Sequence, residues 1–308
     1  MEILDIPVEG RQLAWAGITT GSAGDDLVSS EQLLHLAGLD WEVAKRPLLR
    51  TNLQGEVVQS QRSFEIYRTD TGEELGTVKS KYEVWQNRDA FAFGDALVAD
   101  GKARWVDAGL QGNGWRVFMT MQLNEPFTVH DDQFNLYLYL RTSHDGSSSV
   151  SGYVTPIKVW CTNQLPLVSR TALDKFSFQH TSKLSERIEE AKKSFELTVN
   201  FEREFKASME QLLKTEVTDD KARLLIKEVI PQTRPRREDM VEAIMLNYQT
   251  SETTQPYRNT AYGLLNGLTE YMDHKKVQRS GNSRFESIML GEGAKYRTNL
   301  AQRLLALS

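Results

Sequence analysis

The sequence predicts an α+β protein, in which an antiparallel β-rich N-terminal half with one internal helix packed on the sheet precedes an α-helical C-terminal half. Three observations support this. Residues 41–180 contain short runs rich in β-branched and aromatic residues. One helical pattern, at 87–100, interrupts them, and from Thr181 onward apolar residues recur at helical spacing. We therefore expect an acidic N-terminal arm with a short helix in 1–40, a β-rich core in 41–180 and a helical region in 181–308.

The composition is that of a globular protein, with 40% hydrophobic and 26% charged residues in a chain of 308. No run approaches eighteen apolar residues, and the first residues lack a basic stretch followed by an apolar one. Neither a membrane span nor a secretory signal is therefore expected. The single cysteine, Cys161, cannot form an internal disulfide, which favours a small buried side chain and a cytoplasmic protein.

The net charge of −5 argues against a protein that coats duplex DNA through its overall charge. The acidity is concentrated near the N-terminus, because residues 1–40 hold seven acids and one base, whereas residues 181–308 hold 19 acids and 21 bases. A local basic surface for nucleic acid is compatible with this distribution.

Residues 1–28 are rich in Gly, Asp, Thr and Ser and are expected to be irregular. Ser29 or Ser30 can cap a short helix that ends at Gly38. Four β-rich runs follow, WEVAKRPLL, GEVVQ, SFEIYR and LGTVKSKYEVW. The turn residues TDTGEE between the last two predict a hairpin.

The internal helix is predicted from Asn87, its cap, to just before Gly101. The strands after it include FNLYLYL, in which side chains alternate strictly between the two faces of a sheet. One face carries Asn135, Tyr137 and Tyr139, and the other carries Phe134, Leu136, Leu138 and Leu140. This alternation predicts an antiparallel meander covered on one side. Pro156 in the last run favours an edge strand or a bulge.

A long helix is predicted over 182–214, beginning at Ser182. Its apolar residues follow a heptad pattern: Leu184, Ala191, Phe205 and Leu212 recur at sevens, with Ile188, Phe195 and Met209 at the second position. The helix either packs on its own domain or pairs with a partner helix. Shorter helices are predicted over 219–229, 236–248, 259–273 and 294–307.

His144 and Asp145, in the run His-Asp-Gly-Ser, are the weak candidates for catalysis. The run is either an ordinary turn between strands or a functional loop, in which a neutral imidazole serves as general base and Asp131 or Asp132 contributes a carboxylate. The histidines show no metal-ligand spacing, and no nucleophile elbow or phosphate-binding lysine loop is present. We therefore expect no metal and no cofactor.

Basic residues lie beside aromatic residues at two places on the predicted strands. Tyr82 and Trp85 follow Lys79 and Lys81, and Trp105 follows Arg104. Single-stranded nucleic acid is bound by cations that meet phosphates and rings on which bases stack, although solvated charges beside core aromatics give the same pattern. The candidate nucleic-acid-binding residues are Lys79, Lys81, Trp85, Lys102, Arg104, Trp105, Tyr137 and Lys158.

Several stretches together resemble one family. They are GLDWEV (38–43), YEVWQNRDAFAFGDALV (82–98), TSHDGSSSV (142–150), PIKVWCTN (156–163), FQHT (178–181), TAYGLLNGLTEYMDHKK (260–276) and LGEGAKYRTNLAQRLL (290–305). In this order they resemble the phage- and plasmid-borne proteins grouped as domain-of-unknown-function family 932. The resemblance implies a mobile-element context and transfers no catalytic residue. Gln164-Leu165-Pro166 departs from the Asn-Thr-Leu that usually follows CTN in the family, which puts the start of the next helix in doubt.

The predicted order of a hairpin, a helix, a meander and then helices is also similar to the core of recombinational annealing proteins, as a fold-level analogy. The first hypothesis is therefore an oligomeric accessory protein of DNA metabolism that binds and anneals single-stranded DNA without catalytic residues. The alternative is a protein-binding factor that acts on a host protein or defence system. A second alternative is a metal-dependent hydrolase or nuclease that uses His144 and Asp145.

Overall fold

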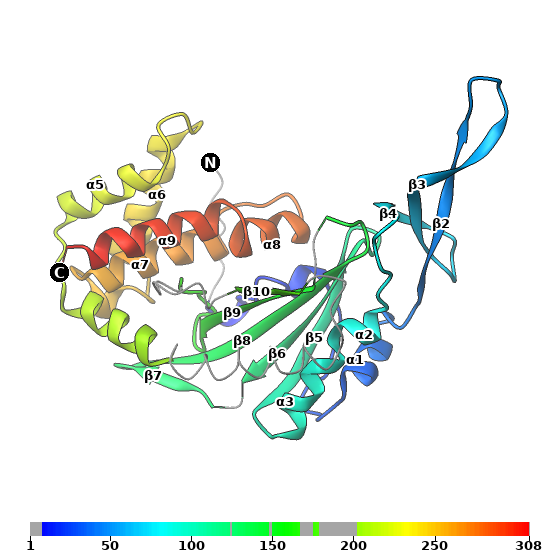
Figure 1. The fold of residues 1–308 in the computed structure, drawn as a ribbon. Coiled ribbons are helices and arrows are strands. Elements are labelled where there is room, and N and C mark those ends of the chain that lie inside the picture. The colour runs from blue at the N-terminus through cyan, green and yellow to red at the C-terminus, as the bar shows by residue number, and fades with distance from the viewer. Residues whose placement is uncertain (1–7, 124, 148–149, 167–174, 179–201, 308) are drawn as a thin grey trace.

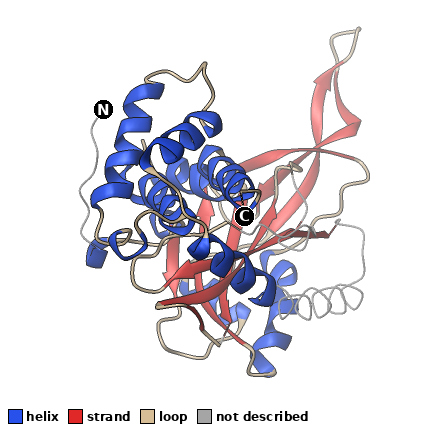
Figure 2. Cartoon of the chain, turned by 90° about the vertical axis from the view of Figure 1, so that its left-hand side faces the viewer, coloured by secondary structure: helices blue, strands red, loops and turns tan. Residues whose placement is uncertain are grey.

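The computed structural model describes residues 8–123, 125–147, 150–166, 175–178 and 202–307. The predicted α+β class is confirmed: antiparallel sheets form the N-terminal half, and helices form the C-terminal half. The helices of the C-terminal half gather at one end of a large sheet, and a long hairpin extends from the other end (Figures 1 and 2).

The large sheet has the strand order β1-β5-β6-β8-β9-β10, with β7 paired to β8, and every pair is antiparallel. Its strands are β1 (Thr19–Ser22), β5 (Ala103–Gln111), β6 (Arg116–Leu123), β7 (Phe127–Val129), β8 (Asp132–Ser143), β9 (Val150–Lys158) and β10 (Lys175–Phe178). Pro156 lies opposite Leu136 of β8, whereas β10 pairs only with residues 150–153. The proline therefore lies beyond the part of β9 that pairs with β10, and no ladder hydrogen bond to β10 is lost there.

The alternation predicted for β8 is confirmed, but the sheet is covered on both faces. Phe134 and the three leucines belong to the main core, whereas Tyr137 and Tyr139 belong to a second cluster with Trp15 and Phe285. The second face is thus covered by the N-terminal segment, which was predicted as an irregular arm, and by a C-terminal helix. A lone tryptophan in a glycine-rich stretch has no periodicity, so the sequence pattern did not reveal its burial.

Short helices cover the main-core face of the sheet. The helix α1 (Ser30–Leu36) begins with a capping box between Ser29 and Gln32, as its sequence indicates. The internal helix is divided into α2 (Asn87–Phe91), a 3-10 turn (Ala92–Gly94) and α3 (Asp95–Ala99). Gly94 lies at this break, and the close approach of Trp105 requires a glycine there, because a Cβ would lie 2.6 Å from the indole ring.

A second sheet contains β2 (Val43–Thr51), β3 (Val57–Arg68) and β4 (Glu74–Lys79). The hairpin predicted at TDTGEE is confirmed as the β3–β4 connection. Two boundaries were wrong: GEVVQ and SFEIYR form the single strand β3, and the last predicted run is a strand only through Lys79. We call β2, β3 and their turn (43–68) the projecting hairpin; its far end is a two-stranded ribbon, because β4 pairs only with residues 63–67 of β3.

The helical half contains α5 (Asp219–Val229), α6 (Arg237–Thr250), α7 (Ala261–Glu270), a π-helical turn (Tyr271–Lys275), α8 (Gly281–Met289) and α9 (Glu292–Leu305). The four predicted short helices are confirmed, and α8 was missed because its glycine and serines read as a loop. Residues 202–214 are helical, whereas the first part of the predicted long helix lies outside the described residues. Phe205, Met209 and Leu212 are buried in the main core, so this stretch packs on its own domain.

Candidate nucleic-acid interface

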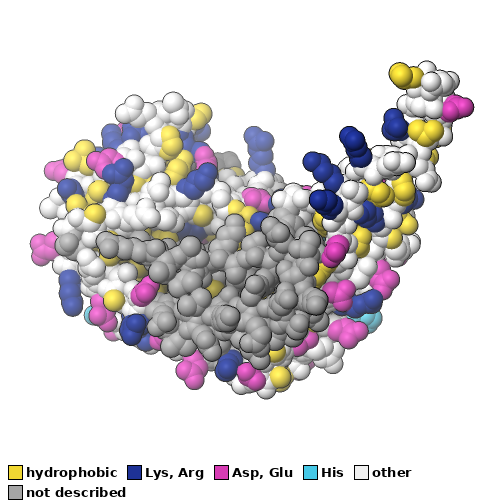
Figure 3. All heavy atoms as spheres, viewed as in Figure 1, with side chains coloured by type: hydrophobic (Ala, Val, Ile, Leu, Met, Phe, Trp, Pro, Cys, Tyr) yellow, Lys and Arg dark blue, Asp and Glu magenta, His cyan; other side chains and the backbone are white. Residues whose placement is uncertain are grey.

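The projecting hairpin and the end of β4 beside it are the basic part of an acidic chain. Residues 45–66 and 79–81 hold six bases and two acids, although the whole chain has a net charge of −5. The bases are Lys45, Arg46, Arg50, Arg62, Lys79 and Lys81. Figure 3 shows Lys and Arg side chains along the hairpin, on the side that faces the helical half. A local positive potential therefore surrounds an element that projects into solvent.

Four of these cations have no carboxylate partner. Arg50, Arg62, Lys79 and Lys81 are exposed, and none of them forms an ion pair with another described residue. Arg46 instead pairs with Glu65 at 2.5 Å and lies 4.3 Å from the ring centre of Tyr67. Unpaired exposed cations are the ones available to neutralise phosphates.

The strand register places Arg46 and Lys79 on the outward face of the small sheet, whereas Lys45 lies opposite Ile66 on the inward face. Arg46 lies opposite Glu65, and Lys79 lies opposite Ser63, two residues along the same face. The inward face carries Ile66 and Val78, which are buried. Tyr67 shares the outward face and is half-buried, so the aromatic residue beside the cations here is Tyr67. Sequence reasoning missed Arg46, Arg50, Arg62 and Tyr67.

The base of the hairpin is fixed by hydrogen bonds from the start of α2. The Gln86 amide accepts from the Val43 N–H at 2.9 Å and donates to the Val43 carbonyl at 3.0 Å. Nδ2 of the neighbouring Asn87 donates to the Leu39 carbonyl at 2.8 Å. Its Oδ1 forms a second hydrogen bond with His144 Nε2, also at 2.8 Å. Three of the stretches that resemble the family, GLDWEV, YEVWQN and HDGS, therefore meet where β2 begins.

We call the hydrogen-bonded group at the base of the hairpin the anchor, and His144 and Asp145 belong to it. His144 is 1% exposed, and its ring lies 5.5 Å from that of Trp41. Asp145 accepts hydrogen bonds from the Ser143 hydroxyl and the Ser147 N–H, at 2.8 and 2.9 Å. Burial alone would raise the pKa of Asp145, but these hydrogen bonds and the Arg116 charge lower it. The Asp145 backbone packs against Gly76 of β4, where a Cβ would come within 2.5 Å of its Cα. The turn thus joins the two sheets.

The described residues bring no further catalytic group to this turn. Asp131 is exposed and pairs with His130, while Asp132 pairs with Lys158. No group of three or more His, Cys, Asp or Glu with metal-binding geometry occurs within the described ranges. The convergence that the nuclease alternative requires is therefore not found there.

The other candidate residues lie on the large sheet. Trp105 is fully buried and donates to Asp95 at 2.7 Å, and Tyr137 is buried against Trp15, so neither presents a face for stacking. Lys158 is 1% exposed and cannot reach a phosphate. Their assignment as binding residues is corrected on this ground: both faces of the large sheet are covered, and a strand pattern alone does not reveal the second cover.

The remaining three candidates are partly or fully accessible. Lys102 is exposed and lies 3.2 Å from Asp100. Arg104 donates to the Gly24 carbonyl and to Gln122, both at 2.9 Å. Trp85 is half-buried and packs against the main core. Of the original candidates, Lys79, Lys81 and Trp85 belong to the small sheet and the segment that follows it, and of these three the two lysines are exposed.

A buried ionic group joins the large sheet to the helical half. Lys158 Nζ lies 2.7 Å from Asp132 Oδ2, and the Tyr262 hydroxyl of α7 donates to the same oxygen at 2.5 Å. The Lys158 ammonium also lies 5.3 Å from the Tyr257 ring and 5.7 Å from the Tyr262 ring. Burial and the neighbouring Asp132 carboxylate raise the pKa of Tyr262 well above its usual value, which keeps this hydroxyl a donor.

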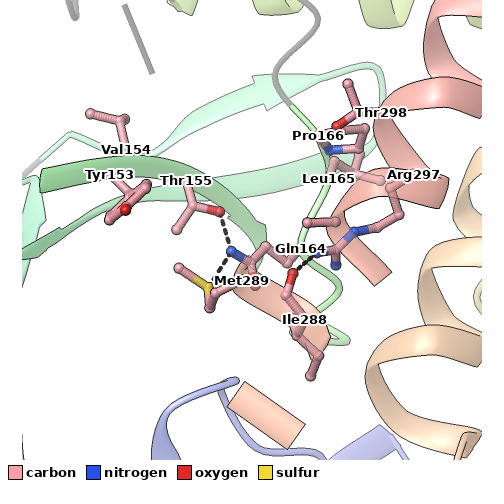
Figure 4. A pocket seen from close by; sticks show the side chains of 11 residues that line it. Tyr153, Val154, Thr155, Gln164, Leu165, Pro166, Ile288, Met289, Arg297 and Thr298 are labelled. Atoms are coloured by element: carbon pink, nitrogen blue, oxygen red, sulfur yellow. Dashed lines mark hydrogen bonds between the residues drawn. The ribbon is translucent and has the colours of Figure 1, made fainter. Parts of the chain in front are cut away.

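A second polar centre forms where CTNQ (161–164) meets TEYMDH (269–274). Asp273, in the π-helical turn, accepts from the Gln164 N–H at 2.9 Å and from Arg297 of α9 at 2.5 Å. Figure 4 shows Gln164 and Arg297 lining a pocket beside this contact. Cys161 is buried, as predicted, and burial raises the pKa of its thiol to about 11. Single π-helical turns occur frequently at functional sites.

His274 of this centre makes stability depend on pH. Burial, together with the charges of Arg11, Arg284, Arg297 and Lys275, lowers the pKa of His274 from 6.5 to about 3. Below pH 6.5 the His274 imidazole therefore binds a proton in the unfolded chain and remains neutral in the folded chain. Because the unfolded state binds more protons, stability is lost as the pH falls. We expect the free energy of unfolding to drop by about 1 kcal/mol between pH 7 and pH 5.5 through this group.

Urea unfolding at the two pH values measures this drop, and the His274→Leu variant is the control. The variant should lose that part of the pH dependence while the contribution of every other group remains. An identical drop in both proteins would show that another group is responsible.

The comparisons with known proteins give a family and no closer relative. No helix in the described part of the chain is long and apolar enough to cross a membrane. No curated protein and no solved structure matches the chain. The model of the family described as "Domain of unknown function (DUF932)" matches residues 74–289, more than two thirds of the chain, which includes β4 but not β2 and β3. The chain therefore belongs to the DUF932 family.

Proposed function

We propose that this protein is an accessory factor of DNA metabolism that binds single-stranded DNA along the projecting hairpin and anneals it as an oligomer. The observation that carries the proposal is a set of four exposed cations that form no ion pair with a described residue: Arg50 and Arg62 on the hairpin, and Lys79 and Lys81 at the end of β4 beside it. Binding of this kind requires no catalytic residue, because cations neutralise phosphates and a ring stacks on a base.

The hairpin suits a flexible strand better than a duplex. Its far end is a ribbon of two strands, and Tyr67 with Arg46 supplies a ring and a cation on the same face. An unpaired strand can follow such a ribbon and stack a base on a partly exposed ring, whereas the bases of a duplex are already stacked.

The tip of the hairpin supports the oligomeric part of the proposal. Leu49, Leu53 and Val57 are 67%, 102% and 69% exposed. Both edges of the ribbon lack a neighbouring strand among the described residues, and an isolated two-stranded ribbon is only marginally stable in water. We infer that a second copy covers the tip.

Polar substitution of the tip tests this contact. We expect Leu49→Thr/Leu53→Asn/Val57→Thr to convert the oligomer to a monomer while the unfolding midpoint of the monomer stays unchanged, because these side chains contribute nothing to the core. Sedimentation velocity over a range of concentrations measures the mass. Leu224→Asn/Leu246→Asn, which removes exposed leucines from the helical half, is the matched control. A wild-type chain that is monomeric at every concentration would contradict the inference.

Fluorescence anisotropy of a labelled single-stranded oligonucleotide, beside a duplex of the same length and at two salt concentrations, tests the DNA-binding part. We expect preference for the single strand and weaker binding at high salt. Absence of binding at low salt would refute the proposal. The same exposed tip also fits the alternative, a factor that binds a host protein; in that case a host protein should co-purify at fixed stoichiometry after nuclease treatment.

A further inference from the structure

A pocket of about 240 Å³ lies between the N-terminal segment and the start of α8. The residues that matter for its chemistry are Arg11, His274, Lys276, Gln278, Ser280 and Arg284. It lies on the helical side of the molecule and shares no residue with the projecting hairpin, so its function is independent of DNA binding by the hairpin.

The pocket carries an excess of positive charge. The Arg284 guanidinium donates to carbonyl oxygens of Gln12, Leu13 and Asp273, at 2.7–3.3 Å, and it forms no ion pair with a carboxylate of the described residues. Arg11 pairs with Glu270 at 2.8 Å, and Lys276 pairs with Glu292 at 3.2 Å. The Asp273 carboxylate also borders the pocket, but Arg297 and the Gln164 N–H already hold it.

Two polar atoms at the pocket have no hydrogen-bond partner. His274 is 4% exposed, and its Nε2 is buried without a partner among the described residues; the same holds for Nε2 of Gln278. Buried polar groups are almost always hydrogen-bonded in native proteins, so orphan atoms at the same pocket indicate a missing group. An amide NH₂ only donates, and His274 Nε2 donates in the tautomer that carries its proton there, so a single acceptor would satisfy both atoms.

The start of α8 borders the same pocket. Ser280 caps this nine-residue helix by accepting from the Ser283 N–H at 3.1 Å, and Gly281 is its first residue. Gly281 packs directly on Gly17, because a Cβ on Gly281 would lie 2.4 Å from the Gly17 carbonyl oxygen. The N-terminal segment therefore closes over a helix end that favours anions.

We propose that this pocket binds the phosphoryl group of a small anion, either inorganic phosphate or a nucleoside phosphate. Arg284 and Lys276 neutralise the phosphoryl charge, His274 and Gln278 donate to its oxygens, and the first N–H groups of α8 complete the shell. The three phosphoryl oxygens match a set of sites that consists mainly of donors.

Isothermal titration of the full chain with inorganic phosphate, with AMP and with adenosine tests the proposal. We expect binding of phosphate or AMP and none of adenosine. Binding of phosphate alone identifies the free ion as the ligand, and much tighter binding of AMP identifies a nucleotide. Absence of binding of both anions, or binding of adenosine as tight as that of AMP, would overturn the proposal.

Variants locate the site. Lys276→Met and His274→Leu should each weaken binding at least tenfold, because each removes a donor to a charged group. Lys295→Met, which removes an exposed charge of α9 outside the pocket, should change it less than twofold. Lys79→Glu/Lys81→Glu should also retain phosphate binding, which separates this site from the hairpin. If His274→Leu does not fold, the comparison of Lys276→Met with Lys295→Met tests the site by itself. Equal affinity of these two variants for phosphate would show that the anion binds elsewhere.

Discussion

Reversal of the charges at Lys79 and Lys81 should weaken binding of single-stranded DNA about 100-fold at low salt. Each lysine is exposed and has no ion pair with a described residue, so each is free to contact a phosphate. Loss of one charge-assisted contact costs about 1.5 kcal/mol, which is roughly a tenfold loss of affinity. Two losses multiply to about 100-fold, and the new carboxylates add repulsion.

Salt dependence distinguishes this mechanism from a distorted fold. Each lost phosphate contact lowers the slope of log affinity against log salt by about 0.7 for a single strand, so the double variant should lower it by about 1.4. Lys221→Glu/Lys295→Glu, an equal charge change on exposed lysines of the helical half, is the matched control and should reduce affinity far less. An equal loss in both double variants would show that overall charge is responsible, and the hairpin would have no special role.

The elements that periodicity controls were predictable from the sequence. The two faces of β8 and the helices α5, α6, α7 and α9 follow from alternation and helical spacing, because burial of one face imposes each pattern. The cover of the second sheet face was not predictable, because Trp15 is a single aromatic residue without a repeating neighbour. Likewise, α8 begins with glycine and serines, and its burial rests on Phe285 and Ile288 alone.

The candidate interface was predicted only in part, for a related reason. A basic residue next to an aromatic residue gives the same sequence pattern whether the ring lies in the core or on the surface. At Lys79 and Lys81 the cations are exposed, whereas Trp105, beside Arg104, is fully buried. The length of β3 determines which cations lie on the hairpin. The sequence predicted two shorter strands, GEVVQ and SFEIYR, because Ser60-Gln61-Arg62 between them has no strand pattern, although it is part of β3.

The family match connects these observations, since it includes the anchor but not the hairpin strands themselves. Gln86, Asn87 and His144 lie within the matched residues 74–289, whereas β2 and β3 precede them. The side chains that fix the base of the hairpin are thus part of the family domain. An anchor of two side-chain amides and a buried imidazole holds a projecting element in one orientation, which a binding surface requires and a passive loop does not.

Substitution of Lys158 by methionine should destabilise the protein by about 3–5 kcal/mol, the largest loss of stability that we expect for a single change. Lys158 is 1% exposed, and its ammonium lies 2.7 Å from Asp132 Oδ2. Without it the Asp132 carboxylate remains buried with only hydroxyl donors such as Tyr262, and an uncompensated buried charge is costly. Because β8, β9 and α7 all meet here, the junction between the sheet and the helical half loosens first.

The paired variant Lys158→Met/Asp132→Leu separates the cost of a lone charge from the value of the ion pair. Replacing both partners by apolar residues of similar size leaves no unpaired charge, so we expect the double variant to recover most of the stability that Lys158→Met loses. Urea unfolding followed by circular dichroism measures both free energies. If the double variant is as unstable as the single one, the ion pair contributes directly to stability. If Lys158→Met does not change the free energy of unfolding, water hydrates the Asp132 carboxylate in the variant. The junction is then more accessible to water than the packing around Tyr257 and Tyr262 indicates.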